Sequence, residues 1–293
     1  MTDRMKETVA ESGATSRGDL LREIPRNWYR LNRGIRVLIV LGCSIALWEV
    51  AVILFEVKEF LVPRPSVVAV LMFDDPWWML SHTWHTLLET LIGFILAVAL
   101  GILLAILIVS SRFLEETLYV LLVTLNSIPK VAVAPLFVVW MGTGLSPKVA
   151  IATMIALFVI VIDMVLGLRS VDPEMIDLAR SMKASRMKTL FKIRFPHALP
   201  NLFAGMKVGI TLALIGAIVG EFVASDRGLG YIILVAQGQF DTPQMFVAVV
   251  LLAVLGTVLF FLVDLAEKIF LPWHVSRRRD EGEGAAARIA GAA

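Results

Sequence analysis

The sequence predicts an all-α integral membrane protein with six transmembrane helices. Its 293 residues are 58% hydrophobic and 18% charged, whereas soluble domains are about 45–50% apolar and about 25% charged. The apolar excess is gathered in runs that approach or exceed the roughly 20 residues needed to cross a bilayer. No segment shows the alternating pattern that is typical of a strand. These three observations together favour a helical membrane protein.

Six stretches are predicted to span the membrane: 36–56, 84–109, 113–141, 147–168, 201–224 and 244–270. The third is interrupted by Pro129, Lys130 and Pro135, and proline removes a helical hydrogen bond. The membrane tolerates the freed backbone groups only inside protein or beside water. We therefore expect residues 126–135 either to line a pathway or dimer interface, or to form a simple proline kink.

Lysine and arginine are concentrated on one side of these spans, in the loops 110–112 and 169–200 and in the tail. Because basic loops stay cytoplasmic, both termini are predicted to be cytoplasmic. Residues 1–35 are then predicted to form a cytoplasmic tail with an interfacial segment. The six-span domain comprises residues 36–274, and residues 275–293 form a second cytoplasmic tail. The net charge of +2 is too small to suggest a nucleic-acid partner.

The loop 169–200 is polar and basic, yet its pattern predicts two short helices. Asp172, followed by a proline, is a good start for the first helix, and Ser185 could cap the second. Pro196 and Pro200 are expected to end that second helix and turn the chain.

Two amphipathic helices outside the membrane have two possible roles. The segment could lie on anionic lipid, held by its positive charge. Alternatively, it could dock onto a cytosolic partner, because small residues at its tip let another backbone approach closely: Ala179, Ser181, Ala184 and Ser185.

The segment 172–200 resembles the cytoplasmic loop of importer-type ABC transporter permeases, the binding-protein-dependent inner-membrane components. That pattern has a Glu-Ala-Ala triad, a glycine, an isoleucine and a Leu-Pro pair, which here are Asp177-Leu178-Ala179, Lys183, Ile193 and Phe195-Pro196. A glycine permits a tight turn, so Lys183 must meet this geometry with a different backbone or some strain. The resemblance extends from about Pro63 to His274 and is closest to the nitrate/sulfonate/taurine and pyrimidine-precursor branch.

The resemblance implies a type I ABC importer permease fold in a bacterial inner membrane. It also implies a second permease copy as a homodimer, cytosolic ATPase subunits that hold ATP and Mg, and a substrate-binding protein outside. The helix at about 174–188 would dock onto the ATPase through Asp177, Ala179, Arg180, Ser181, Met182, Lys183, Ala184 and Ser185. No catalytic residue, cofactor or metal is expected in this chain. The cargo would be a small solute of the sulfonate, nitrate or taurine type, or a pyrimidine or aromatic precursor.

Asp163 and Glu221 are candidates for the pathway because ionisable groups within spans are costly. Asn126, Ser127 and Pro129 are candidates because they lie at the break in the third span. In the permeases that this chain resembles, the fifth span lines the pathway, which adds Thr211 and supports Glu221. Glu221 is near an outer end, where it could face a vestibule. Glu49 and Asp264 are expected only to cap, snorkel or pair near an interface. Glycines at 205, 209, 216 and 220 predict close helix packing.

Other functional classes find little support in the residues. No phosphate-binding loop or metal-spaced His/Cys cluster appears, and His82 and His85 are interpreted as interface histidines. The chain is therefore not expected to be an enzyme. A secondary transporter or channel without an ATPase remains the alternative.

Overall fold

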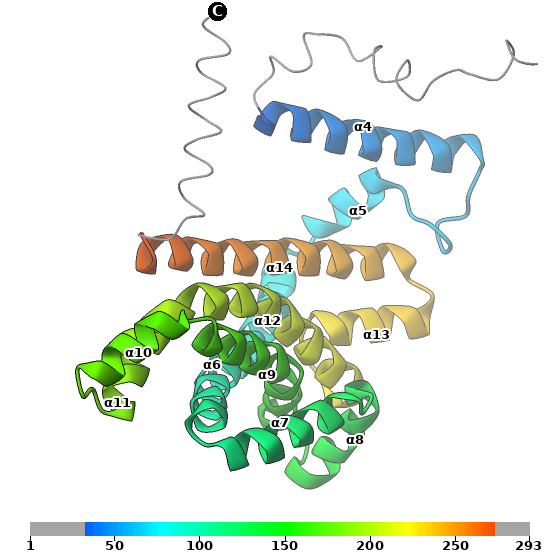
Figure 1. Ribbon diagram of the computed structural model, residues 1–293. Helices are drawn as coiled ribbons and strands as arrows, with labels where there is room; N and C mark the ends of the chain where they lie inside the picture. The colour runs from blue at the N-terminus through cyan, green and yellow to red at the C-terminus, as the bar shows by residue number, and fades with distance from the viewer. Residues whose placement is uncertain (1–32, 273–293) are drawn as a thin grey trace, which may run out of the picture. The chain divides into compact units, whose positions relative to one another are not determined.

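The computed structural model describes residues 33–272, and within that range every regular element is a helix (Figure 1). The described chain divides into two compact units. Residues 33–58 with 64–66 form the first, and residues 59–63 with 67–272 form the second. The predicted tails 1–35 and 275–293 lie almost wholly outside the described residues.

The first unit is built on α4 (Arg33–Leu54), an apolar helix of 22 residues. Its single acidic residue, Glu49, accepts hydrogen bonds from the backbone N of Ser66 at 3.0 Å and from the Ser66 hydroxyl at 2.7 Å. Glu49 is therefore paired, in agreement with its predicted structural role.

The second unit contains four long helices: α6 (Pro76–Ser110), α9 (Leu145–Arg169), α12 (Phe195–Ala224) and α14 (Thr242–Phe270). Aspartates start two of them. Asp75 accepts from the N–H of Trp78 at 3.0 Å and Asp241 from the N–H of Gln244 at 3.1 Å. The remaining elements are shorter: α5 (Pro65–Met72), α7 (Arg112–Asn126), α8 (Lys130–Met141), α10 (Pro173–Ser181), α11 (Arg186–Thr189), the π turn η1 (Leu190–Arg194) and α13 (Leu229–Gln239).

Helix α9 forms the core of this unit and meets both α6 and α12 at very short range. A Cβ atom on Gly216 of α12 would lie 2.6 Å from the Cα of Ala152, and one on Gly93 of α6 would lie 2.5 Å from the Ala152 Cβ. Only glycine fits at such approaches. The predicted close packing of the fifth span is therefore confirmed, with α9 as the partner.

Helices α6 and α9 run in the same direction, because Gly93 and Gly101 contact Ala152 and Ile160 in the same order along both helices. Two parallel spans that follow each other in sequence need a connection that returns the chain across the membrane. If α6 and α9 both cross the membrane, the segment α7–α8, which joins them, has to be that connection.

The predicted third span, 113–141, is not one continuous helix. It is split into α7 with 15 residues and α8 with 12, each too short to span a bilayer alone. The break falls at Pro129, which cannot donate a helical hydrogen bond. Within residues 33–272, five helices are long and apolar enough to cross a membrane, so six continuous spans are not confirmed.

The prediction that Pro196 and Pro200 end a helix is wrong. The chain is helical from Arg186 to Ala224, a stretch of 39 residues. The π turn η1 stands immediately before this pair of prolines, and the N–H of Phe195 bonds to the carbonyl of Leu190. A π turn shifts the hydrogen-bond register, and Pro196 falls in the first turn of the α-helix that follows, where proline is tolerated. Pro200 lies inside this helix without interrupting it.

Helix α14 packs against α12 in the opposite direction and neutralises a lysine within it. The Lys207 ammonium lies 2.5 Å from a carboxylate oxygen of Asp264 and 2.5 Å from one of Glu267. Asp264 is thus paired, as expected.

Candidate functional site

The segment α10–α11, residues 172–189, begins with the cap that the sequence predicts. The Asp172 carboxylate accepts a hydrogen bond from the N–H of Glu174 at 2.9 Å, and Pro173 occupies the first turn. On the helix surface Asp177 and Arg180 form an exposed ion pair of 3.0 Å. Such a surface pair contributes little stability, so the helix depends mainly on its ends and its buried face.

The turn between α10 and α11 has the geometry that a glycine usually provides. Lys183 has a φ of 55°, in the left-handed region. Its N–H bonds to the carbonyl of Arg180 at 2.8 Å, and the N–H of Ala184 bonds to the carbonyl of Ala179 at 2.9 Å. This pair of bonds is the Schellman arrangement that terminates helices. Lys183 therefore adopts the glycine conformation rather than a different backbone.

The second helix starts at Ser185, as predicted. The Ser185 hydroxyl accepts a hydrogen bond from the N–H of Lys188 at 3.3 Å.

The α10–α11 segment exposes several large apolar side chains. Met182 is 75% exposed, while Leu178 and Met187 are each 63% exposed. Ala179, which is predicted to belong to the docking contact, is buried in the isolated chain, and its carbonyl accepts one of the hydrogen bonds of the turn. Ala184 is half-buried. The other predicted docking residues are exposed: Asp177, Arg180, Ser181, Met182, Lys183 and Ser185.

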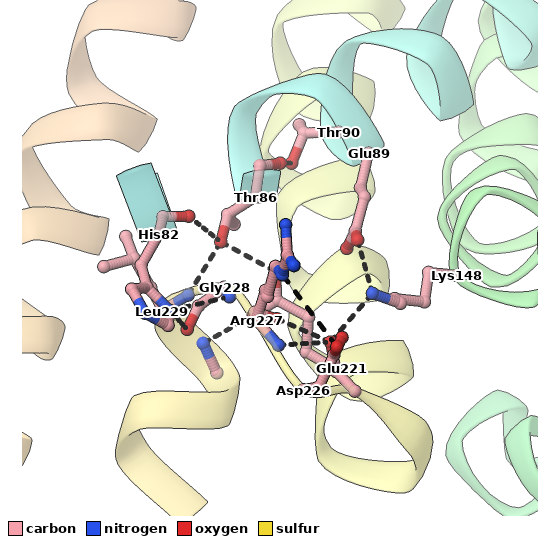
Figure 2. A network of polar contacts seen from close by, with 12 residues as sticks. His82, Thr86, Glu89, Thr90, Lys148, Glu221, Asp226, Arg227, Gly228 and Leu229 are labelled. Carbon is pink, nitrogen blue, oxygen red and sulfur yellow. Dashed lines mark hydrogen bonds and ion pairs between the residues drawn. The ribbon is translucent and has the colours of Figure 1, made fainter. Parts of the chain in front are cut away.

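A cluster of buried charges lies at the opposite end of the bundle, between α6, α9 and α12 (Figure 2). The Lys148 ammonium forms an ion pair with Glu89 at 2.6 Å and donates to the hydroxyl of Ser225 at 2.8 Å. Glu89, Lys148 and Glu221 are all almost completely buried. Since a buried charge without a partner is very costly, these contacts hold the three helices in register.

Glu221 also fixes the loop that leads to α13. Its carboxylate accepts from the Thr86 hydroxyl at 2.7 Å and from the N–H of Gly230 at 2.5 Å. The N–H of Leu229 donates to Thr86 at 2.8 Å, and the N–H of Gly228 donates to a ring nitrogen of His82 at 3.0 Å. Glu221 is therefore fully buried, and the expectation that it faces a vestibule is wrong.

His82, Thr86 and Glu89 were missed as members of this cluster. They lie at helical spacing on one face of α6, and all three are buried. His82 bonds within the protein, with its ring nitrogen accepting from the N–H of Gly228. The periodicity of polar residues within an apolar helix was the available signal.

The other pathway candidates lie on different helices. Thr211 is exposed on α12, whereas Asp163 of α9 is half-buried, and a Cβ atom on Gly205 would lie 2.9 Å from its carboxylate. Ser127 and Pro129 are exposed at the break between α7 and α8. There, Asn126 accepts a hydrogen bond from the ammonium of Lys130. Within residues 33–272 no group of three or more His, Cys, Asp or Glu side chains is arranged to bind a metal.

The sequence and the fold are both similar to those of known transport proteins. Residues 97–273 match the family described as binding-protein-dependent transport system inner membrane component. The chain is 36% identical to the riboflavin transport system permease protein RibX of Chloroflexus aurantiacus, over 93% of this chain and 100% of that protein. It is 32% identical to the formylaminopyrimidine transport permease protein ThiX of Halalkalibacterium halodurans, over 78% of this chain and 91% of that protein.

More distant similarities agree. The putative aliphatic sulfonates transport permease protein SsuC of Bacillus subtilis is 29% identical over 93% of this chain and 99% of that protein. Among solved structures, a chain of the inward-facing MetNI methionine ABC transporter superposes with a TM-score of 0.61 at 21% identity. That superposition covers 67% of this chain and 99% of the other.

The match covers more than half of the chain, and the fold is that of type I importer permeases. Members of this family are not themselves catalytic, because a separate subunit hydrolyses ATP. The protein therefore belongs to the binding-protein-dependent inner membrane components, the multi-pass permease subunits of ABC importers.

Proposed function

We propose that this chain forms the translocation pathway for a small solute and is driven by a cytosolic ATPase that docks onto the α10–α11 segment. The single observation that carries this proposal is the exposure of Leu178, Met182 and Met187 on short helices beyond the ends of the apolar spans. Exposed apolar groups of this size on a rigid element favour a protein partner.

Several features of the segment support a role in transmitting force. Its first helix is capped at both ends, and the Schellman turn links it tightly to α11. From Arg186 the chain is helical without interruption through α12. A displacement of α11 by the ATPase would thus be passed directly to α12, which packs along α9.

The distribution of charge supports an orientation with this segment in the cytoplasm. Lysine and arginine are concentrated in residues 169–200, while the loops at the other end of the predicted spans hold few. In this orientation both termini are cytoplasmic. The buried Glu89–Lys148–Glu221 cluster then lies near the outer face, where a substrate-binding protein would deliver the solute. A second copy of this chain, as a homodimer, completes the pathway.

The relatives suggest the class of solute. They are named for riboflavin, formylaminopyrimidine and aliphatic sulfonates. We propose a small solute of these classes, either a sulfonate-type compound or a pyrimidine-type or other aromatic precursor.

Docking is tested by Ala184→Trp, with Ala184→Ser as the matched control. Ala184 is half-buried beside the turn, so a bulky side chain there should hold the partner away. Overpacking costs about 1–3 kcal/mol, so we expect at least about fivefold less ATPase to co-purify. ATP-driven uptake should also be lost, while the amount of permease in the membrane stays unchanged.

The serine variant should retain both the partner and uptake. Normal uptake and normal ATPase recovery with Ala184→Trp would remove the docking assignment.

A further inference from the structure

The break between α7 and α8 places a lysine at an unusual depth. The Lys130 ammonium lies 5.6 Å from the ring centre of Phe158. Phe158 is near the middle of α9, a helix of 25 residues that would be roughly 37 Å long at 1.5 Å per residue. Because α9 is long enough to cross a membrane, this contact brings the Lys130 ammonium to the depth of the middle of α9 rather than to that of its ends.

The side chain is tied in place at this depth. A lysine near the end of a span can extend its ammonium to the interface. Here the ammonium instead donates to the side-chain oxygen of Asn126, one turn earlier, and rests over the Phe158 ring. These contacts come from both sides of the helix break and from α9, so they fix the ammonium where the backbone is already interrupted.

The charge of Lys130 is not balanced locally. Among residues 33–272, no carboxylate lies within ion-pair distance of its ammonium. An amide oxygen and an aromatic face stabilise a cation only partly. A lysine in the membrane interior is costly and functional by default, and irregular backbone at that depth is tolerated where it lines a watery cavity.

We propose that Lys130, supported by Asn126 and Phe158, forms a mid-membrane subsite that binds an anionic group of the translocated solute. The ammonium keeps donors free for oxygens of a sulfonate, carboxylate or phosphate. This inference rests on the proposed pathway function and narrows it, because it selects the solutes that carry an anionic group among the classes proposed above.

The test uses thiol chemistry, because Cys43 is the only cysteine in the sequence. In the Cys43→Ala background, Ser127→Cys places a thiol at an exposed position, at most about 11 Å along the chain from Lys130. Membrane vesicles with the full-length protein are treated with an anionic and a cationic methanethiosulfonate, and both reaction rates are measured. We expect both reagents to react, and the anionic-to-cationic rate ratio to fall about fivefold or more when Lys130→Gln is added.

Two controls sharpen the test. Lys130→Arg keeps the charge and should preserve the rate ratio. Leu100→Cys, on α6 at a similar depth and 43% exposed, should face lipid and react with neither reagent.

Three results would overturn the subsite: an unreactive Ser127→Cys, a rate ratio unchanged by Lys130→Gln, or a Leu100→Cys that reacts as fast as Ser127→Cys. The assay needs neither ATP nor a partner. A failure of the docking prediction in the Ala184 variants therefore does not affect the thiol measurement. A failure of the thiol measurement likewise does not affect the docking test.

Discussion

At the scale of single residues, Lys183 shows how a sequence can depart from a family pattern and keep its geometry. The left-handed conformation costs a non-glycine residue about 1–2 kcal/mol. The two hydrogen bonds of the turn and the cap at Ser185 hold Lys183 in that conformation. The lysine therefore changes the charge at the tip of the segment without changing the path of the chain.

Replacing Lys183 with glycine should stabilise this turn. Glycine relieves the backbone cost, although its larger entropy in the unfolded chain offsets about 0.5–1 kcal/mol of the gain. We expect slower hydrogen exchange at the amides of residues 183 and 184 in Lys183→Gly, measured by mass spectrometry in nanodiscs. Lys183→Val should exchange faster, because a β-branched residue fits the left-handed region poorly. Faster exchange in the glycine variant would show that Lys183 is not strained.

Residue patterns predicted the ends of the α10–α11 segment better than they predicted burial. Asp172 and Ser185 were identified as caps because capping depends on local sequence alone. Glu221 was misplaced because its surroundings come from residues far away in the chain. Glu221, for example, is bound by Thr86, 135 residues earlier. No local pattern specifies such a partner.

At the scale of helices, the contact between α9 and α12 depends on which atoms face each glycine. A Cβ atom on Gly216 would meet the backbone of Ala152, at 2.6 Å from its Cα. A Cβ atom on Gly209 would instead meet side-chain atoms, with the Cδ1 and Cγ1 of Ile160 both at 3.0 Å and the Phe94 ring at 3.7 Å. The backbone of Ala152 cannot rotate away from a new Cβ atom, whereas the side chain of Ile160 can adjust by the few tenths of an ångström that a 3.0 Å contact requires.

We therefore expect Gly216→Ala to destabilise the protein far more than Gly209→Ala, although both lie on α12. A cost of about 2 kcal/mol corresponds to a lower Tm by about 4–8 °C, which can be measured by thermal denaturation in detergent. Gly209→Ala should stay within about 1 °C of the wild type. Equal effects of the two substitutions would mean that α12 shifts along α9 to accommodate either one.

The approximate positions of the long apolar helices were predictable from hydrophobicity. Whether each span is one uninterrupted helix was not. The prolines at 129 and 196 look alike in sequence, yet one separates two helices and the other lies within a continuous helical stretch. The difference lies in the π turn before Pro196, which moves the hydrogen-bond register. α13 was missed for a related reason: its 11 residues lie between two spans and are too short to predict a further crossing.

At the scale of the whole second unit, the number of membrane crossings follows from the directions in which the helices run rather than from the length of each helix. α6 and α9 are parallel, so the chain must return between residue 110 and residue 145, although neither α7 nor α8 can span alone. Together they have 27 residues, 15 and 12, which would be enough for one crossing interrupted by the break. The break then lies inside the membrane, as the subsite at Lys130 requires.

This crossing can be tested with single cysteines in the Cys43→Ala background. Ser110 ends α6 and Thr143 precedes α9, and both residues are exposed. A membrane-impermeant maleimide applied to spheroplasts should label Thr143→Cys at once and Ser110→Cys only after permeabilisation, because α7–α8 places them on opposite faces. Labelling of both from the same side would make α7–α8 a re-entrant hairpin. α6 and α9 could not then be two complete crossings in the same direction, and Lys130 would lose the depth from which its role is argued.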